Sequence, residues 1–282
     1  MKWIDSYKSK LVSADKAVSV IKSNQRVYVH PGAATPEVLL TALCNRYKEL
    51  QDVEIIHLLT FGFSLYSHPE YEGHFRHNAL FIGSNVRKAV NEGRADFTPI
   101  FLSEIPNLFY RNILPIDVAL INVSPPDKYG FCSFGVGIEI TKPATECAKI
   151  IIAQINPRQP RTLGNSFIHI DKIDYCVEVD APLLEYITDY ATLKDDEKEI
   201  YENIGKNIAS LVEDGSTLQM GIGNIPDAVL HYLDDKQDLG IHTEMFSDGV
   251  IRLVEKGILT NERKTLHPGK IISSFVLGTK RL

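Results

Sequence analysis

Short runs of β-branched and apolar residues alternate with amphipathic helical segments along the chain, and this alternation constrains the fold more than any other feature. Strands that are connected through helices run parallel, and helices cover both faces of the resulting sheet. The pattern therefore predicts an α/β protein with a parallel-rich sheet. The expected strands span 26–30, 53–59, 79–82, 117–123, 149–155, 175–179, 217–220, 241–243 and 271–277, and the clearest expected helices begin near 13, 36, 200, 226 and 250.

The length of 282 residues favours two domains, because one domain usually spans about 100–200 residues. The polar and charged stretch 192–198 is typical of a linker or a helix start, and the expected boundary lies just before it. The region after the boundary contains only the first half of a typical doubly wound domain. We therefore expect an N-terminal domain at 1–188 and the start of a second domain at 189–282, truncated at its C-terminus.

Charge and apolar patterning limit the function classes. The net charge is −6, whereas a nucleic-acid binder needs a basic face. An anionic ligand is not excluded, because backbone N–H groups can hold phosphates on an acidic protein. The N-terminus lacks a signal peptide's apolar core, and apolar runs such as 150–153 are far shorter than the ~20 residues that span a bilayer. The four cysteines are scattered, which predicts buried free thiols in a reducing compartment, so we expect a cytoplasmic protein with no membrane partner.

The first candidate site is a Gly-x-Gly that follows an expected strand and precedes an expected helix. Gly221 and Gly223 would let backbone N–H groups approach an anion or a developing oxyanion, where side chains would block the approach. A tight connection without a ligand is the alternative. The segment lacks the Lys-Ser/Thr of a P-loop, and Pro226 occupies the third glycine position of the dinucleotide fingerprint, which argues against a Rossmann oxidoreductase.

The second candidate site is Glu244, which ends the expected strand 241–243. Ligands bind open α/β sheets at the carboxyl ends of their strands, and this strand comes directly after the one that leads into the glycines. The two loops should therefore be neighbours. The apolar residues Met245 and Phe246 would partly desolvate the carboxylate and make it a better nucleophile. The alternative is a carboxylate that helps to cap a helix that begins near Ser247.

Two further groups of residues have structural explanations. His68, His74 and His77 could suggest a metal site, but no cysteine or carboxylate completes the set, so a surface loop and no metal are expected. Cys132 could act as a nucleophile, but no base can be paired with it, so a small core residue is expected.

The segments around both candidate sites resemble the acetyl-CoA hydrolase/transferase family, most closely its 4-hydroxybutyrate and butyrate CoA-transferase branch. The His-Thr-Glu-Met-Phe-Ser-Asp-Gly stretch at 242–249 carries the resemblance together with Gly-Ile-Gly at 221–223. Further similar stretches are Phe-Ile-Gly-Ser-Asn-Val-Arg at 81–87, Asn-Glu-Gly-Arg-Ala-Asp at 91–96, Pro-Ile-Phe-Leu-Ser-Glu-Ile-Pro at 99–106 and Val-Ser-Pro-Pro-Asp-Lys-Tyr-Gly at 123–130. Similarity therefore extends over essentially the whole chain.

The resemblance implies two tandem open α/β domains of CoA-transferase type with the active site between them. It also implies that Glu244 is the catalytic nucleophile and that coenzyme A is a substrate, with no permanently bound cofactor. A homodimer fits the family, whose members run to roughly 430 residues. The residues that it implies for CoA binding are Gly221, Ile222, Gly223, Asn224 and Ile225, and those that it implies for lining the acyl pocket are Gln219 and His30 with the loop that follows it.

The implied function is a CoA-transferase that moves CoA between a short-chain acyl-CoA, such as 4-hydroxybutyryl-CoA or butyryl-CoA, and acetate through a glutamyl-CoA thioester. An acyl-CoA hydrolase that uses the same Glu244 is the nearest alternative. A non-catalytic CoA-binding fragment is the alternative from another class.

Overall fold

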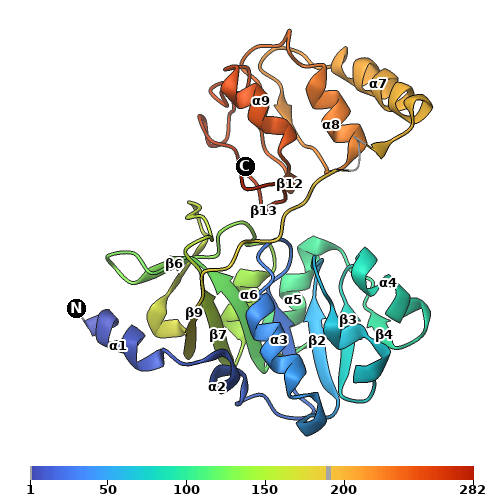
Figure 1. Cartoon of the computed structure of the whole chain (residues 1–282). Helices are drawn as coiled ribbons and strands as arrows, with labels where there is room; N and C mark the ends of the chain where they lie inside the picture. The colour runs from blue at the N-terminus through green and yellow to red at the C-terminus, as the bar shows by residue number, and fades with distance from the viewer. Residues whose placement is uncertain (1, 189–191) are drawn as a thin grey trace. The chain divides into compact units, whose positions relative to one another are not determined.

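The computed structural model describes residues 2–188 and 192–282, which form two compact units, Met1–Leu184 and Glu185–Leu282 (Figure 1). Residue 189, where the second domain is expected to begin, lies outside the described residues. In the part of the chain that the structure describes, no helix is both long enough and apolar enough to cross a bilayer.

The first unit is built on a seven-stranded sheet in which every neighbouring pair of strands is parallel, as the alternation of elements predicts. The strand order is β4-β3-β2-β1-β5-β7-β9. These strands are β1 (Arg26–Val29), β2 (Val53–His57), β3 (Phe75–Ala79), β4 (Ala95–Phe97), β5 (Val118–Val123), β7 (Ile150–Ile155) and β9 (Tyr175–Glu178). The helices are α1 (Lys2–Lys10), α2 (Ala14–Val18), α3 (Glu37–Asn45), α4 (Ser84–Asn91), α5 (Ile105–Tyr110) and α6 (Thr141–Cys147).

Two hydrophobic cores lie on opposite faces of this sheet. All six residues of β5 are buried, and they alternate between the cores: Leu120 packs with α2 and α3, whereas Ile121 packs with α5 and α6. Figure 1 shows α3 in front of the sheet and α5 and α6 behind it. A strand covered on both faces is mostly apolar, and the continuous apolar run Val118–Ile121 explains why the strand at 117–123 could be recognised from the sequence.

The strand expected at 79–82 is wrong, because β3 lies earlier, at Phe75–Ala79. Its sequence, Phe-Arg-His-Asn-Ala, is too polar to predict a buried strand, yet its last three residues are buried beside β2. The expected surface loop around the histidines is therefore also wrong for His77, which is 1% exposed within the sheet. The polar atoms of β3 are accommodated by local partners: the ring Nδ1 of His77 bonds to the carbonyl of Ile55 at 2.9 Å.

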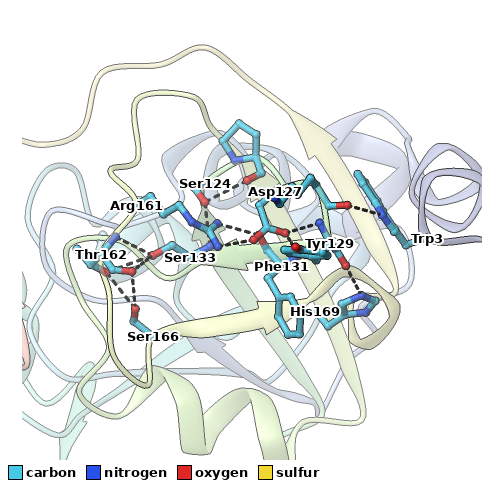
Figure 2. A network of polar contacts seen from close by, with 12 residues as sticks. Trp3, Ser124, Asp127, Tyr129, Phe131, Ser133, Arg161, Thr162, Ser166 and His169 are labelled. Carbon is cyan, nitrogen blue, oxygen red and sulfur yellow. Dashed lines mark hydrogen bonds and ion pairs between the residues drawn. The ribbon is translucent and has the colours of Figure 1, made fainter. Parts of the chain in front are cut away.

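A small antiparallel pair, β6 (Phe131–Ser133) and β8 (Phe167–His169), lies outside the main sheet and was not expected. Figure 2 shows the polar network that holds it. The Arg161 guanidinium pairs with the Asp127 carboxylate at 2.6 Å, and the other oxygen of Asp127 accepts the N–H groups of Tyr129 and Phe131 at 2.8 and 2.9 Å. These bonds fix the segment that follows β5.

Gly135 at the end of this segment provides a test of the packing. Its φ is +70°, and a Cβ there would overlap the Gln159 side-chain amide, which is locked by donating to the carbonyls of Asn122 and Phe134, both at 3.0 Å. We expect Gly135→Ala to destabilise the protein by roughly 2–5 kcal/mol, from backbone strain and overpacking together. Gly93→Ala is the matched control, because Gly93 has φ +75° with open space around it and should cost only about 1 kcal/mol. Urea unfolding measures both, and equal losses would contradict the packing argument.

The second unit contains two pairs of parallel strands, β10–β11 and β12–β13, with three helices in its described residues. Its core joins the helices to β11 through residues such as Leu230, Leu253 and Ile241. The predicted strands at 217–220, 241–243 and 271–277 are present but shorter, because the chain leaves regular pairing near its loops. The elements are α7 (Asp195–Ala209), β10 (Thr217–Leu218), α8 (Asn224–His231), β11 (Gly240–Ile241), β12 (Met245–Phe246), α9 (Gly249–Glu255) and β13 (Phe275–Val276).

Candidate active site

The glycine turn, residues 219–223, connects β10 to the N-terminus of α8 in the second unit. Gly223 has φ +112° and ψ −174°, a conformation that is essentially restricted to glycine. Within the described residues, the backbone N–H groups of Gly221, Ile222 and Gly223 donate to no acceptor. These groups precede a helix N-terminus, where the partial positive charge of the helix dipole favours an anion.

Glu244 lies between β11 and β12, and its main chain is held firmly. Its carbonyl oxygen accepts the N–H groups of Ser274 and Phe275 at 3.0 and 3.2 Å and the Ser274 hydroxyl at 2.8 Å. The single hydrogen of the Ser273 hydroxyl can serve this oxygen at 2.9 Å or the Phe275 carbonyl at 2.6 Å. The side chain is exposed, and its carboxylate makes no hydrogen bond or ion pair with any described residue. The expected desolvation by Met245 and Phe246 is therefore not seen within this unit.

The expected proximity of the two loops is confirmed. β10 and β11 are parallel partners, with Leu218 opposite Ile241. The Thr243 hydroxyl oxygen accepts a hydrogen bond from the N–H of Met220, and the nitrogen and oxygen lie 3.0 Å apart. This bond joins the residue before Gly221 to the residue before Glu244, so the nucleophile candidate and the glycine turn belong to one local structure.

The loop that carries Glu244 is also fixed on its C-terminal side, although not in the way expected. Ser247 does not cap α9: the N-cap is Asp248 without a side-chain bond, and the Ser247 hydroxyl instead donates to Asp227 at 3.1 Å. Burial raises the pKa of the Asp227 carboxyl above its usual range, and the bond from Ser247 opposes this shift. Asp248 accepts the N–H of Thr279 at 3.0 Å. The alternative role of Glu244 as a helix cap finds no hydrogen bond to support it among the described residues.

His30 is placed in the first unit, at the end of β1, and its ring is fully buried. Its Nδ1 accepts the N–H of Asn122 at 3.2 Å, so its Nε2 carries the hydrogen and donates to the carbonyl of Gly137 at 2.7 Å. Burial lowers the pKa of His30 to about 4, so the imidazole is neutral. Both nitrogens are occupied, which leaves no polar atom of the ring for a substrate.

The remaining candidates lie around the glycine turn. Gln219 is exposed directly after β10, Ile222 and Asn224 are half-buried, and Ile225 is exposed in the first turn of α8. Cys132 is buried on β6, and burial raises the pKa of its thiol to about 12, so it is the expected core residue. Among residues 2–188 and 192–282, no group of three histidine, cysteine or acidic side chains could hold a metal ion.

The family model for the acetyl-CoA hydrolase/transferase N-terminal domain matches residues 1–187. The 4-hydroxybutyrate coenzyme A transferase of Clostridium kluyveri is 53% identical over 100% of this chain, which spans 64% of that protein. The succinyl-CoA:acetate/propanoyl-CoA:succinate CoA transferase of Fasciola hepatica is 46% identical over 96% of the chain, which spans 55% of it.

A solved structure agrees with these relatives. The crystal structure of 4-hydroxybutyrate CoA-transferase from Porphyromonas gingivalis superimposes with a TM-score of 0.86 at 38% identity, over 99% of this chain and 65% of that one. The chain thus spans 55–65% of the length of these three proteins. The matched domain, the seven-stranded parallel sheet and the full-length similarity agree, and the chain belongs to the acetyl-CoA hydrolase/transferase family.

Proposed function

We propose that the protein is a CoA-transferase that moves CoA between a short-chain acyl-CoA and acetate, with Glu244 as the nucleophile. One observation carries this proposal: an exposed carboxylate on a hydrogen-bonded main chain stands beside a turn in which the N–H groups of Gly221, Ile222 and Gly223 are unpaired within the described residues. The names of similar proteins support 4-hydroxybutyryl-CoA or butyryl-CoA as the acyl donor.

The proposed reaction proceeds by two exchanges at the Glu244 carboxyl. The carboxylate attacks the thioester carbonyl, the C–S bond breaks, and CoA leaves as a thiolate, so that an acyl-glutamyl anhydride forms. The thiolate then attacks the glutamyl carbonyl, which releases the first acid and leaves a glutamyl-CoA thioester. Acetate reverses both steps, and the covalent path divides one difficult exchange into easier ones. A carboxylate suits this role because anhydride and thioester both retain the activated acyl bond.

The glycine turn has two roles in this proposal. Gly221, Ile222, Gly223, Asn224 and Ile225 would bind CoA, and N–H groups of the turn would stabilise the tetrahedral oxyanion. Removing one such donor from other enzymes costs about 2.7–4 kcal/mol of transition-state stabilisation. Gln219 is exposed next to the turn and is proposed to line the acyl pocket.

The proposal also covers the second domain, the oligomeric state and the location of the protein. The parallel strands and helices of Glu185–Leu282 support a second α/β domain of CoA-transferase type that follows the first. A homodimer in the cytoplasm, with coenzyme A as substrate and no permanently bound cofactor, completes the proposal.

Trapping the covalent intermediate tests the nucleophile. After incubation with butyryl-CoA, the peptide that contains Glu244 should gain the mass of CoA less one water, and sodium borohydride should then reduce the thioester and inactivate the enzyme. Adding acetate before the borohydride should remove the adduct and protect the activity. An adduct on a different residue, or none, would contradict the assignment.

The exposure of Glu244 favours one alternative, an acyl-CoA hydrolase in which water replaces acetate as the acceptor. The two activities differ in their products. A transferase releases little free CoA from butyryl-CoA without acetate and forms acetyl-CoA with it, whereas a hydrolase releases free CoA at the same rate in both cases.

A further inference from the structure

Strands β10 and β11 stop pairing immediately before the two loops of the candidate site. Their last partners are Leu218 and Ile241, and the N–H of His242 still donates to the carbonyl of Leu218 at 3.0 Å. If the parallel ladder continued, the N–H of Met220 would donate to a backbone carbonyl of the neighbouring strand. It donates instead to the Thr243 hydroxyl at 3.0 Å. The Thr243 side chain therefore takes the place of a backbone acceptor at the point where the two loops separate.

The same hydroxyl has further acceptors within reach. The carbonyl oxygens of Met220 and Met245 lie 2.8 and 3.0 Å from the Thr243 oxygen, and its single hydrogen can serve either. Thr243 is only 6% exposed, so water cannot readily replace these bonds, and an unpaired N–H at Met220 would be costly. One hydroxyl thus connects the main chain on both sides of Glu244 to the residue before Gly221.

The main chain of Thr243 is bound in a different direction. Its N–H donates to the carbonyl of Ile272 at 3.0 Å, and His242 and Ile272 form an isolated parallel bridge. From Thr243 onward the backbone therefore pairs with the segment that leads into β13, and His242 is the last residue whose N–H still bonds to β10. The Thr243 hydroxyl still bonds to Met220, which follows β10. The side chain of Thr243 therefore connects the Glu244 loop to the glycine turn, and the backbone of Thr243 does not.

We propose that Thr243 is a positioning residue that sets the distance between the Glu244 carboxylate and the N–H groups of the glycine turn. The proposal rests on the proposed function of Glu244. Thr243 is assigned no contact with substrate and acts only through the two loops that it joins. Attack on a thioester requires reacting atoms about 3–3.5 Å apart with the oxyanion donors already in place, so a shift of about 1 Å between these loops can lower the rate about 10²-fold.

The test compares Thr243→Val with Thr243→Ser in the full protein. Valine keeps the shape of the side chain and removes the hydroxyl, whereas serine keeps the hydroxyl. We expect Thr243→Val to lower kcat roughly 10–100-fold and to change the KM for butyryl-CoA by less than about threefold, because catalytic geometry is lost before substrate binding. Thr243→Ser should stay within about threefold of wild-type kcat, since it can make the same hydrogen bonds.

Rapid quenching and mass spectrometry separate this inference from the proposed function. The wild type should form the CoA adduct on Glu244, and Thr243→Val should form the same adduct more slowly by the factor seen in kcat. An equal rate of adduct formation in both proteins, or a serine variant as slow as the valine variant, would overturn the positioning role alone. A wild type that forms no adduct would overturn the proposed function and this inference with it.

Thr260→Val provides the matched control for a lost hydroxyl in the same unit. The Thr260 hydroxyl donates to Asp238 at 3.2 Å and lies outside the glycine turn and the Glu244 loop. Its kcat should remain within about twofold of the wild type, since no group that positions Glu244 is changed. Thermal unfolding of each variant confirms that rates are compared between folded proteins, and a Thr260 variant as slow as Thr243→Val would overturn the proposal.

Discussion

Replacing Glu244 with glutamine is expected to lower the rate of CoA exchange by roughly 10⁴-fold or more while the protein stays folded. The amide retains the shape of the carboxylate but lacks the charge and nucleophilicity needed to attack a thioester. Because the side chain is exposed and bonds to no described residue, its replacement removes no stabilising contact. The measurement is kcat for exchange between butyryl-CoA and acetate, with thermal unfolding to check the fold.

Two further variants test whether the expected loss of activity is specific to the Glu244 carboxylate. Glu244→Asp keeps the charge but withdraws the carboxylate by one methylene, so it should retain more activity than glutamine, with a loss of about 10²-fold. Glu262→Gln is the matched control, because Glu262 is also an exposed glutamate of the second unit and lies outside the candidate site. Wild-type activity is expected for this control. Exchange within tenfold of the wild type in Glu244→Gln would mean that another group attacks the thioester.

The proximity of Glu244 to the glycine turn could be predicted because it follows from topology. Consecutive parallel strands place the loops after their carboxyl ends side by side, whatever the details of their side chains. The strand at 117–123 was equally predictable, since its residues Val118–Ile121 form the continuous apolar run that is typical of a strand buried on both faces. The rigid support of Glu244 was not predictable, because it comes from Ser273 and Ser274, about thirty residues away, as the hydrogen bonds to its carbonyl show.

Two of the errors share a physical cause. The predicted position of β3 was wrong because its His77 and Asn78 are polar. Both residues are nevertheless buried, and both bond to residues of the neighbouring strand β2, which the local sequence does not encode. Ser247 has the residue type and position of an N-cap, but its hydroxyl donates to the carboxylate of Asp227. In both cases a tertiary partner overrode a local preference. The pocket role of His30 came from the family resemblance, and its buried ring is bonded to Asn122 and Gly137.

The buried histidines lead to the second large prediction, a loss of stability in mild acid. His57 and His77 stack with ring centroids 4.1 Å apart, and Nε2 of His57 lies 2.6 Å from the Tyr66 hydroxyl. Nε2 of His77 is buried without a partner among the described residues. Burial lowers the pKa of His30 and of His77 from 6.5 to about 4, and burial together with the charge of His77 lowers that of His57 well below 6.5.

These shifts fix the sign of the pH dependence. Between about pH 6.5 and pH 4, the unfolded chain binds protons at these histidines and the folded protein does not, so stability falls as the pH falls. A pKa lowered from 6.5 to about 4 corresponds to roughly 3 kcal/mol of stability for each of His30 and His77, lost progressively across that range. Their combined loss is comparable to the total stability of many domains, about 5–15 kcal/mol, so the first unit should unfold readily near pH 4.

Urea unfolding at pH 7.0 and pH 4.5 measures this loss, with the fluorescence of Trp3 as the signal. Trp3 is the single tryptophan of the chain and donates to the carbonyl of Lys128, so it reports on the first unit. In His77→Asn the amide can still donate to Ile55 but cannot be protonated, and the stability difference between the two pH values should shrink by roughly 2 kcal/mol. Carboxylates that titrate in this range affect both proteins equally and cancel. His68→Asn, at an exposed position, should keep the wild-type difference, and an unchanged difference in His77→Asn would show that this imidazole is protonated in the folded protein.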